Sequence, residues 1–140
     1  ASVLTAKEDY YGAIKDLQKA AELNPRIEEI YIAFSDNYIG LNDFEKALKY
    51  INMAISVNAK NIFTLNLRGL LKSKIRDYAG ALADYNNNIL LFPGEWRTYV
   101  LRGKLKFEHL ADKAGACNDF RKAKELGSDS APQLIQENCQ

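Results

Sequence analysis

Histidine and cysteine are scarce in this chain of 140 residues, which has one histidine and two cysteines. Cys117 and Cys139 lie 22 residues apart and, together with His109, match no zinc-ligand spacing. A nucleophilic triad would need His109 as its base, but its place in a predicted turn favours a solvated surface histidine. The glycines form neither a phosphate loop nor a dinucleotide fingerprint. We therefore expect no metal site, no cofactor and no enzymatic activity.

An excess of charge of one sign is also lacking, since 19 basic residues face 18 acidic ones. Such a balance gives no reason to expect a nucleic acid or a membrane surface as partner. No apolar run approaches the roughly 18 residues that a membrane span needs, so we expect no membrane insertion. Apolar residues make up 47% of the chain, which is enough for the core of a single domain.

The sequence does contain an internal repeat with a period of 34 residues. Ala13, Ala47 and Ala81 follow this period, and Ala116 comes 35 residues after Ala81. We place the single extra residue in the turn around His109, where an insertion disturbs least. Further columns with the same spacing are Leu17, Ile51, Tyr85 and Phe120; Ala20, Ala54, Asn88 and Ala123; Asp9, Asp43, Asp77 and Asp112; and Ser35, Gly69 and Gly103.

Each repeat is predicted to be a pair of antiparallel helices. An aspartate just before an apolar-periodic stretch is typical of an N-cap, because its carboxylate accepts from free backbone N–H groups. The spacing of Ala13, Leu17 and Ala20 places all three on one face of a helix. The predicted helices are 9–23, 28–41, 43–57, 62–75, 77–91, 95–108, 112–126 and 130–138, and 1–6 is interpreted as the tail of an earlier helix.

These columns resemble the tetratricopeptide repeat family, whose pattern combines aromatic, small and alanine positions in two helices. The second repeat carries the pattern most fully. Lys72 and Lys106 depart from it, because they stand where the family has the second aromatic residue of the first helix. The matching residues of the second repeat are Tyr31, Phe34, Ser35, Tyr38, Phe44, Ala47, Ile51 and Ala54.

The resemblance implies an all-α fold, a right-handed superhelical solenoid of about three and a half repeats with a C-terminal capping helix. We expect one array over 1–140, divided into a partial repeat at about 1–27, full repeats at 28–61, 62–95 and 96–129, and a capping helix at 130–138. Gly127 fits a helix C-cap and Ser128 to Ser130 supply N-cap side chains for that last helix. Because the first repeat lacks most of its first helix, we also expect the array to continue upstream, or a segment there to have been removed.

Two alternatives are open for the cysteines. In antiparallel helices of equal rise, the nine residues from Cys117 to Leu126 and the nine from Ser130 to Cys139 bring both cysteines to one level, so a disulfide is geometrically reasonable. Otherwise Cys117 is a small buried residue and Cys139 a free thiol. The run from Gly115 to Phe120 with Cys139 is similar to the last repeat of some bacterial cell-envelope members of the family, which favours the periplasm or envelope, with the cytoplasm as alternative.

In this family the first helices of successive repeats line a concave groove that holds a peptide or a partner helix. The resemblance places Phe63, Asn66, Leu70, Lys74, Arg97, Val100, Lys104 and Phe107 in this groove. Basic residues dominate its C-terminal half, so a partner segment with acidic and apolar residues would suit it; the alternative is that these lysines and arginines only solubilise the helices. Ile32, Asp36, Leu67 and Leu101 stand where a clamp for a chaperone's carboxylate would need Lys, Asn and Arg, so we expect no such clamp.

The sequence therefore predicts a scaffold for protein–protein interaction that binds a protein or peptide in its groove. The alternative is a structural segment of a larger bacterial envelope or secretion assembly. The period and its columns identify neither the partner nor the oligomeric state.

Overall fold

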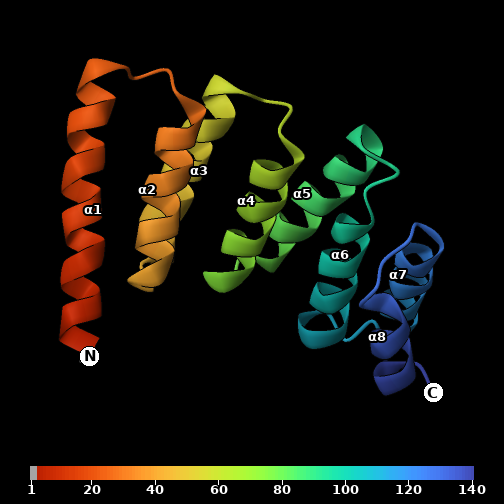
Figure 1. Cartoon of the computed structure of the whole chain (residues 1–140). Coiled ribbons are helices and arrows are strands. Elements are labelled where there is room, and N and C mark those ends of the chain that lie inside the picture. Colours follow the sequence, from red (N-terminus) through yellow and green to blue (C-terminus); the bar gives the residue numbers. More distant parts are fainter. Residues whose placement is uncertain (1–2) are drawn as a thin grey trace. The chain divides into compact units, whose positions relative to one another are not determined.

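The computed structural model describes residues 3–140, which form eight α-helices and no strand (Figure 1). The predicted all-α class is therefore confirmed. None of the helices in this described part is long and apolar enough to cross a membrane. The helices are α1 (Val3–Leu23), α2 (Glu28–Gly40), α3 (Phe44–Val57), α4 (Ile62–Lys74), α5 (Tyr78–Leu91), α6 (Trp96–His109), α7 (Lys113–Glu125) and α8 (Ala131–Asn138).

The helices form two compact units that divide after Ile75. In the N-terminal unit α2 packs against both α1 and α3, and α3 packs against α4. In the C-terminal unit α6 packs against both α5 and α7, and α7 packs against α8. Within each unit, consecutive helices run antiparallel and are joined by short turns, as Figure 1 shows.

The columns of the repeat form the core of both units. The nine residues of α3, α5 and α7 in the Ala, large and Ala columns expose at most 1% of their surface. Gly103 of α6 allows close approach to α7, because a Cβ atom there would lie 2.6 Å from the Phe120 ring. The nine buried residues are Ala47, Ile51, Ala54, Ala81, Tyr85, Asn88, Ala116, Phe120 and Ala123.

Three of the four periodic aspartates are N-caps. Asp43 accepts from the Lys46 N–H at 3.2 Å, Asp77 from Gly80 at 2.9 Å and Asp112 from Gly115 at 2.8 Å. The residue before each aspartate has a positive φ, which turns the chain sharply between the two helices. These residues are Asn42 (58°), Arg76 (67°) and Ala111 (50°).

The predicted break before Asp9 is wrong, because α1 runs without interruption from Val3 to Leu23. An apolar residue stands two positions before the capping aspartate in the true turns, and Leu41 and Leu110 pack against the core clusters there. The first repeat has Lys7 at this position, and Lys7 and Glu8 are good helix formers. Without an apolar anchor, nothing favours the left-handed residue that the turn requires.

The single extra residue of the fourth repeat lengthens a helix, whereas the prediction placed it in the turn. α6 has 14 residues where α2 has 13, and three residues separate first and second helix in both repeats. His109 is therefore the last residue of α6. Its exposed ring stacks on Tyr78 of α5, with 4.3 Å between ring centroids.

We expect Ala111→Gly to raise the free energy of unfolding by about 0.5–1 kcal/mol. A left-handed backbone costs an L-residue roughly 1–2 kcal/mol, and the greater entropy of glycine in the unfolded chain offsets about half of that. Urea denaturation would measure the change. Asn42→Gly is the matched variant and should gain less, because asparagine tolerates positive φ; an Ala111→Gly protein less stable than the parent would contradict the argument.

The last helix closes the C-terminal unit as a cap. Gly127 has φ 101°, as expected for a helix C-cap. The Ala131 N–H donates to Ser128 Oγ at 3.2 Å, and Ala131 and Leu134 pack against the core cluster around Tyr99. The short α8 thus covers the end of α7.

Candidate functional site

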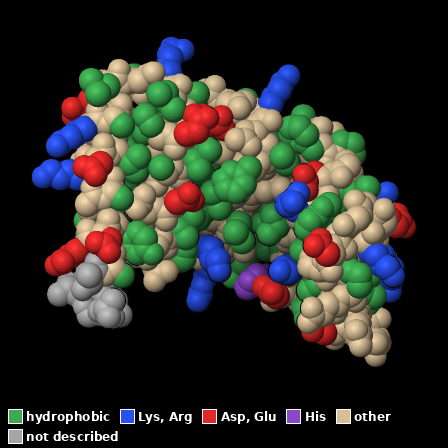
Figure 2. Space-filling view, in the orientation of Figure 1, with side chains coloured by type: hydrophobic (Ala, Val, Ile, Leu, Met, Phe, Trp, Pro, Cys, Tyr) green, Lys and Arg blue, Asp and Glu red, His purple; other side chains and the backbone are tan. Residues whose placement is uncertain are grey.

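The expected contact residues of α4 lie on an exposed surface of the N-terminal unit, with one exception. Phe63 exposes 57% of its surface, Leu70 is half-buried and Lys74 is exposed. Asn66 is buried, so its side chain cannot contribute contact area in this structure. Figure 2 shows hydrophobic side chains gathered over α2 and α4.

A capping residue holds Phe63 at the first turn of α4. The Asn61 side chain accepts from the Phe63 N–H at 3.0 Å and donates to Glu28 of α2 at 2.6 Å. Glu28 also accepts from Asn58 at 3.0 Å. Glu28 therefore stabilises the junction between α2 and α4, and it is not a free acidic contact for a partner.

The expected contact residues of α6 lie in the C-terminal unit. Most of them are exposed, and one is buried. Lys104 is exposed and Phe107 exposes 40% of its surface. The Arg97 guanidinium bonds Glu95 at 3.0 Å and lies over the Trp96 ring at 4.6 Å. Val100 is buried among Tyr99, Ala123 and Ala131, so the sequence assignment of Val100 to a contact surface does not match its place in the core.

Two basic residues of α6, Arg102 and Lys106, form ion pairs with Asp119 of α7. Arg102 donates to both oxygens of Asp119, from Nε at 2.9 Å and from Nη2 at 2.7 Å. Its Nη1 donates to Asn86 at 2.9 Å, and Lys106 Nζ lies 3.2 Å from Asp119 Oδ2. Sequence reasoning missed this network, and its signal was the recurrence of Arg-Gly at 68–69 and 102–103 together with an aspartate at positions 84 and 119.

The acidic residues of α2 differ in their surroundings. Glu29 and Asp36 are exposed on α2, whereas Glu28 is held by two asparagines. Partial burial raises the pKa of the Asp36 carboxyl above its ordinary value. The described residues contain no group of three or more His, Cys, Asp and Glu that could hold a metal ion.

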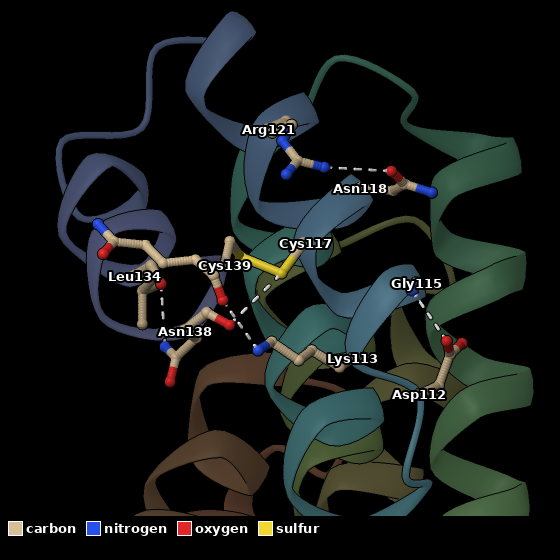
Figure 3. Close-up of a disulfide and its surroundings, with 10 residues drawn as sticks. Asp112, Lys113, Gly115, Cys117, Asn118, Arg121, Leu134, Asn138 and Cys139 are labelled. Carbon is tan, nitrogen blue, oxygen red and sulfur yellow. Dashed lines mark hydrogen bonds between the residues drawn. A yellow bond between two sulfur atoms is a disulfide. The ribbon is translucent and has the colours of Figure 1, made fainter.

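Cys117 of α7 and Cys139 after α8 are joined by a disulfide, with 5.7 Å between their Cα atoms (Figure 3). Figure 3 also shows that Asn138 donates to the Leu134 carbonyl, which closes the last turn of α8. Lys113 Nζ donates to the Gln140 carbonyl at 3.3 Å. The end of the chain is thus held against α7 by one covalent bond and one hydrogen bond.

A comparison with models of known protein families identifies one of the repeats. The model of the tetratricopeptide repeat family matches residues 28–61, the same 34 residues as α2, α3 and the turns that follow them. Residues 28–61 are a tetratricopeptide repeat. No curated protein sequence matches the chain.

Solved tetratricopeptide repeat proteins share the fold over most of the chain. A repeat protein from Parabacteroides merdae is 26% identical with TM-score 0.78, over 89% of this chain and 50% of that one. MamA is 16% identical with TM-score 0.75, over 86% of this chain and 70% of that one. The first repeat domain of Spaghetti (RPAP3), bound to an HSP90 peptide, is 17% identical with TM-score 0.70, over 80% of this chain and 90% of that one. The resemblance to the tetratricopeptide repeat family is therefore confirmed.

Three residues at the positions of a carboxylate clamp pack against apolar core clusters. Leu67 packs against the core cluster of Ala47 and Ile51, and Leu101 packs against the cluster of Ala81 and Tyr85. Ile32 is half-buried beside the cluster around Phe34. None of these three side chains can donate a hydrogen bond to a carboxylate.

Proposed function

We propose that this chain is a protein-interaction module that binds protein or peptide segments on the exposed face of α4 in the N-terminal unit and, separately, on the exposed face of α6 in the C-terminal unit. The observation that carries the proposal is that each of these helices has both an exposed phenylalanine and an exposed lysine. On α4 these are Phe63 and Lys74, and on α6 they are Phe107 and Lys104. Aromatic residues are enriched at protein interfaces, and electrostatic complementarity between charged residues contributes to the choice of partner.

The chemistry of these faces specifies the partner segment. The Lys104 side chain is exposed, in contrast to Arg102 and Lys106, which bond Asp119. A segment that combines an acidic residue with an apolar one would use both kinds of side chain. Peptide binding by the RPAP3 domain is consistent with this use of the fold, although the clamp positions of this chain hold Ile32, Leu67 and Leu101.

Peptide display would test the proposal. We expect random 12-residue peptides selected on the purified protein to be enriched in Asp or Glu next to Phe, Leu or Ile. Lys74→Glu should weaken peptides that bind the α4 face about tenfold at low ionic strength, and Lys104→Glu should do the same for peptides that bind the α6 face; added salt should reduce both differences. Fluorescence anisotropy would measure the affinities.

A matched control is Lys124→Glu, which makes the same charge change at an exposed position of α7. It should leave the affinity unchanged, whereas Phe107→Ala should weaken binding as much as Lys104→Glu. Equal losses with Lys124→Glu would show that net charge alone attracts the peptides. Unchanged affinity in both Lys74→Glu and Lys104→Glu would overturn the assignment of these faces.

A further inference from the structure

The exposed face of α5 carries no charged residue. The structure describes the whole of this helix, and the single charged residue in it, Asp84, is buried. With about 100° of rotation per residue, the exposed side chains fall within one arc of about 140° around the helix. We call this arc the α5 outer face; it comprises Ala79, Ala83, Asn86, Asn87, Leu90 and Leu91.

The repeat does not require an uncharged surface at these positions. Leu90 lies near the middle of the arc and exposes 80% of its surface. Its counterparts in the other repeats are Glu22, Ser56 and Glu125. The counterparts of Ala83 are Lys15, Lys49 and Asn118. Because the other second helices have polar or charged residues there, the exposed leucine is particular to α5 and is not explained by the fold.

The chemistry of the α5 outer face suits a second surface of the same kind. The centres of protein interfaces are depleted in charged residues, and a large exposed apolar side chain is typical of a contact site. The amides of Asn86 and Asn87 can both donate and accept, so they can pair with identical groups. Arg102 borders this face through its bond to Asn86, but Asp119 neutralises its charge. Two copies can therefore meet here without repulsion between like charges.

Four residues of this face follow a spacing that reads the same in both directions. The steps from Ala79 to Ala83, Asn86 and Leu90 are four, three and four residues. If two identical helices lie antiparallel about a two-fold axis, Leu90 of one copy faces Ala79 of the other. In the same arrangement Asn86 faces Ala83. Each larger side chain then meets a smaller one, which allows the two helices to pack closely.

We propose that two copies of this chain associate through their α5 outer faces, with the two helices antiparallel about a two-fold axis. The contact consists of one helix from each copy, so the dimer is of the small and transient kind. The α5 outer face is distinct from the exposed faces of α4 and α6. Self-association through α5 therefore does not depend on the function proposed for those faces.

Sedimentation velocity of the purified chain from about 5 to 500 µM would test the proposal. We expect the sedimentation coefficient to rise with concentration from that of a monomer toward that of a dimer. Leu90→Glu should weaken self-association at least about tenfold, because its carboxylate would lose water against Ala79 of the other copy. The variant should keep its helical circular dichroism, since Glu22 and Glu125 occupy the same column. Leu23→Glu is the matched control: Leu23 exposes 89% of its surface near the end of α1, and the change should have no effect.

A mixture of two variants tests the antiparallel arrangement itself. Ala79→Lys alone should weaken self-association, because two lysines would meet Leu90 of the opposite copies. In an equimolar mixture of Ala79→Lys and Leu90→Glu, the new lysine of one variant would lie beside the new glutamate of the other, so dimers should return. The proposal would be overturned by a parent protein that stays monomeric at the highest concentration, including one that instead binds phosphatidylcholine vesicles through Leu90. An equal loss with Leu23→Glu, or a mixture no more dimeric than either variant alone, would also contradict it.

Discussion

Asp119→Ala should lower the free energy of unfolding of the C-terminal unit by about 3 kcal/mol or more, which is the usual cost of removing one partner from a buried ion pair. The Asp119 side chain exposes 5% of its surface, and those of Arg102 and Lys106 expose 19% each. Without the carboxylate, two cationic groups would stand largely out of water with no anionic partner. Denaturation followed by circular dichroism would measure the loss.

Two variants separate the ion pair from the mere loss of an aspartate. Asp129→Ala removes an exposed carboxyl from the same unit and should change stability by less than about 0.5 kcal/mol. Arg102→Met retains much of the arginine stem while removing its charge, and the cost of Asp119→Ala should be smaller in that background. Additive effects of the two substitutions would contradict a direct interaction.

Reduction of the disulfide between Cys117 and Cys139 should destabilise the C-terminal unit by about 3 kcal/mol, the estimate of the chain-entropy relation for a loop of 22 residues. α8 has eight residues and depends on Ala131 and Leu134 for its apolar contacts, so it should be the first helix to open. Hydrogen exchange of residues 131–138 with and without a phosphine reductant would show the opening.

The Cys139→Ser variant provides the control for that experiment. It should match the reduced parent protein in stability and should not respond to the reductant. Exchange of α5 and α6 should increase less than that of α8, because the core around Tyr85 and Leu105 does not include α8. A parent protein whose exchange at residues 131–138 is indifferent to reductant would contradict the predicted role of the bond.

The helical hairpins could be predicted from the sequence because their signals are local and repeated. The capping bonds of Asp43, Asp77 and Asp112 involve backbone groups three residues away, so position in the sequence nearly specifies the contact. The continuity of α1 could not be predicted, because Asp9 stands at the same position of the repeat as the three capping aspartates. What differs is Lys7, which stands where the true turns have a large apolar residue.

The candidate site was harder to predict because exposure and charge pairing depend on helices that are distant in the sequence. Val100 follows the groove periodicity of α6, yet α7 and α8 enclose it. A count of basic residues treats Arg102 and Lys104 alike, but Arg102 bonds Asp119 of α7 and Lys104 is exposed. Lys106 stands where the family has an aromatic residue, and its ammonium group pairs with Asp119.

The contrast between the aromatic contact of Tyr50 and the ionic contact of Asp119 has a consequence for folding. In a chain of similar hairpins, a first helix can meet the wrong second helix and still find alanines at the expected spacing. Pairing α2 with α7 would set Phe34 and Tyr38 against a carboxylate, and pairing α6 with α3 would set a guanidinium against an aromatic ring in place of its carboxylate. The difference between the two contacts therefore disfavours mispairing between the helices of the second repeat and those of the fourth.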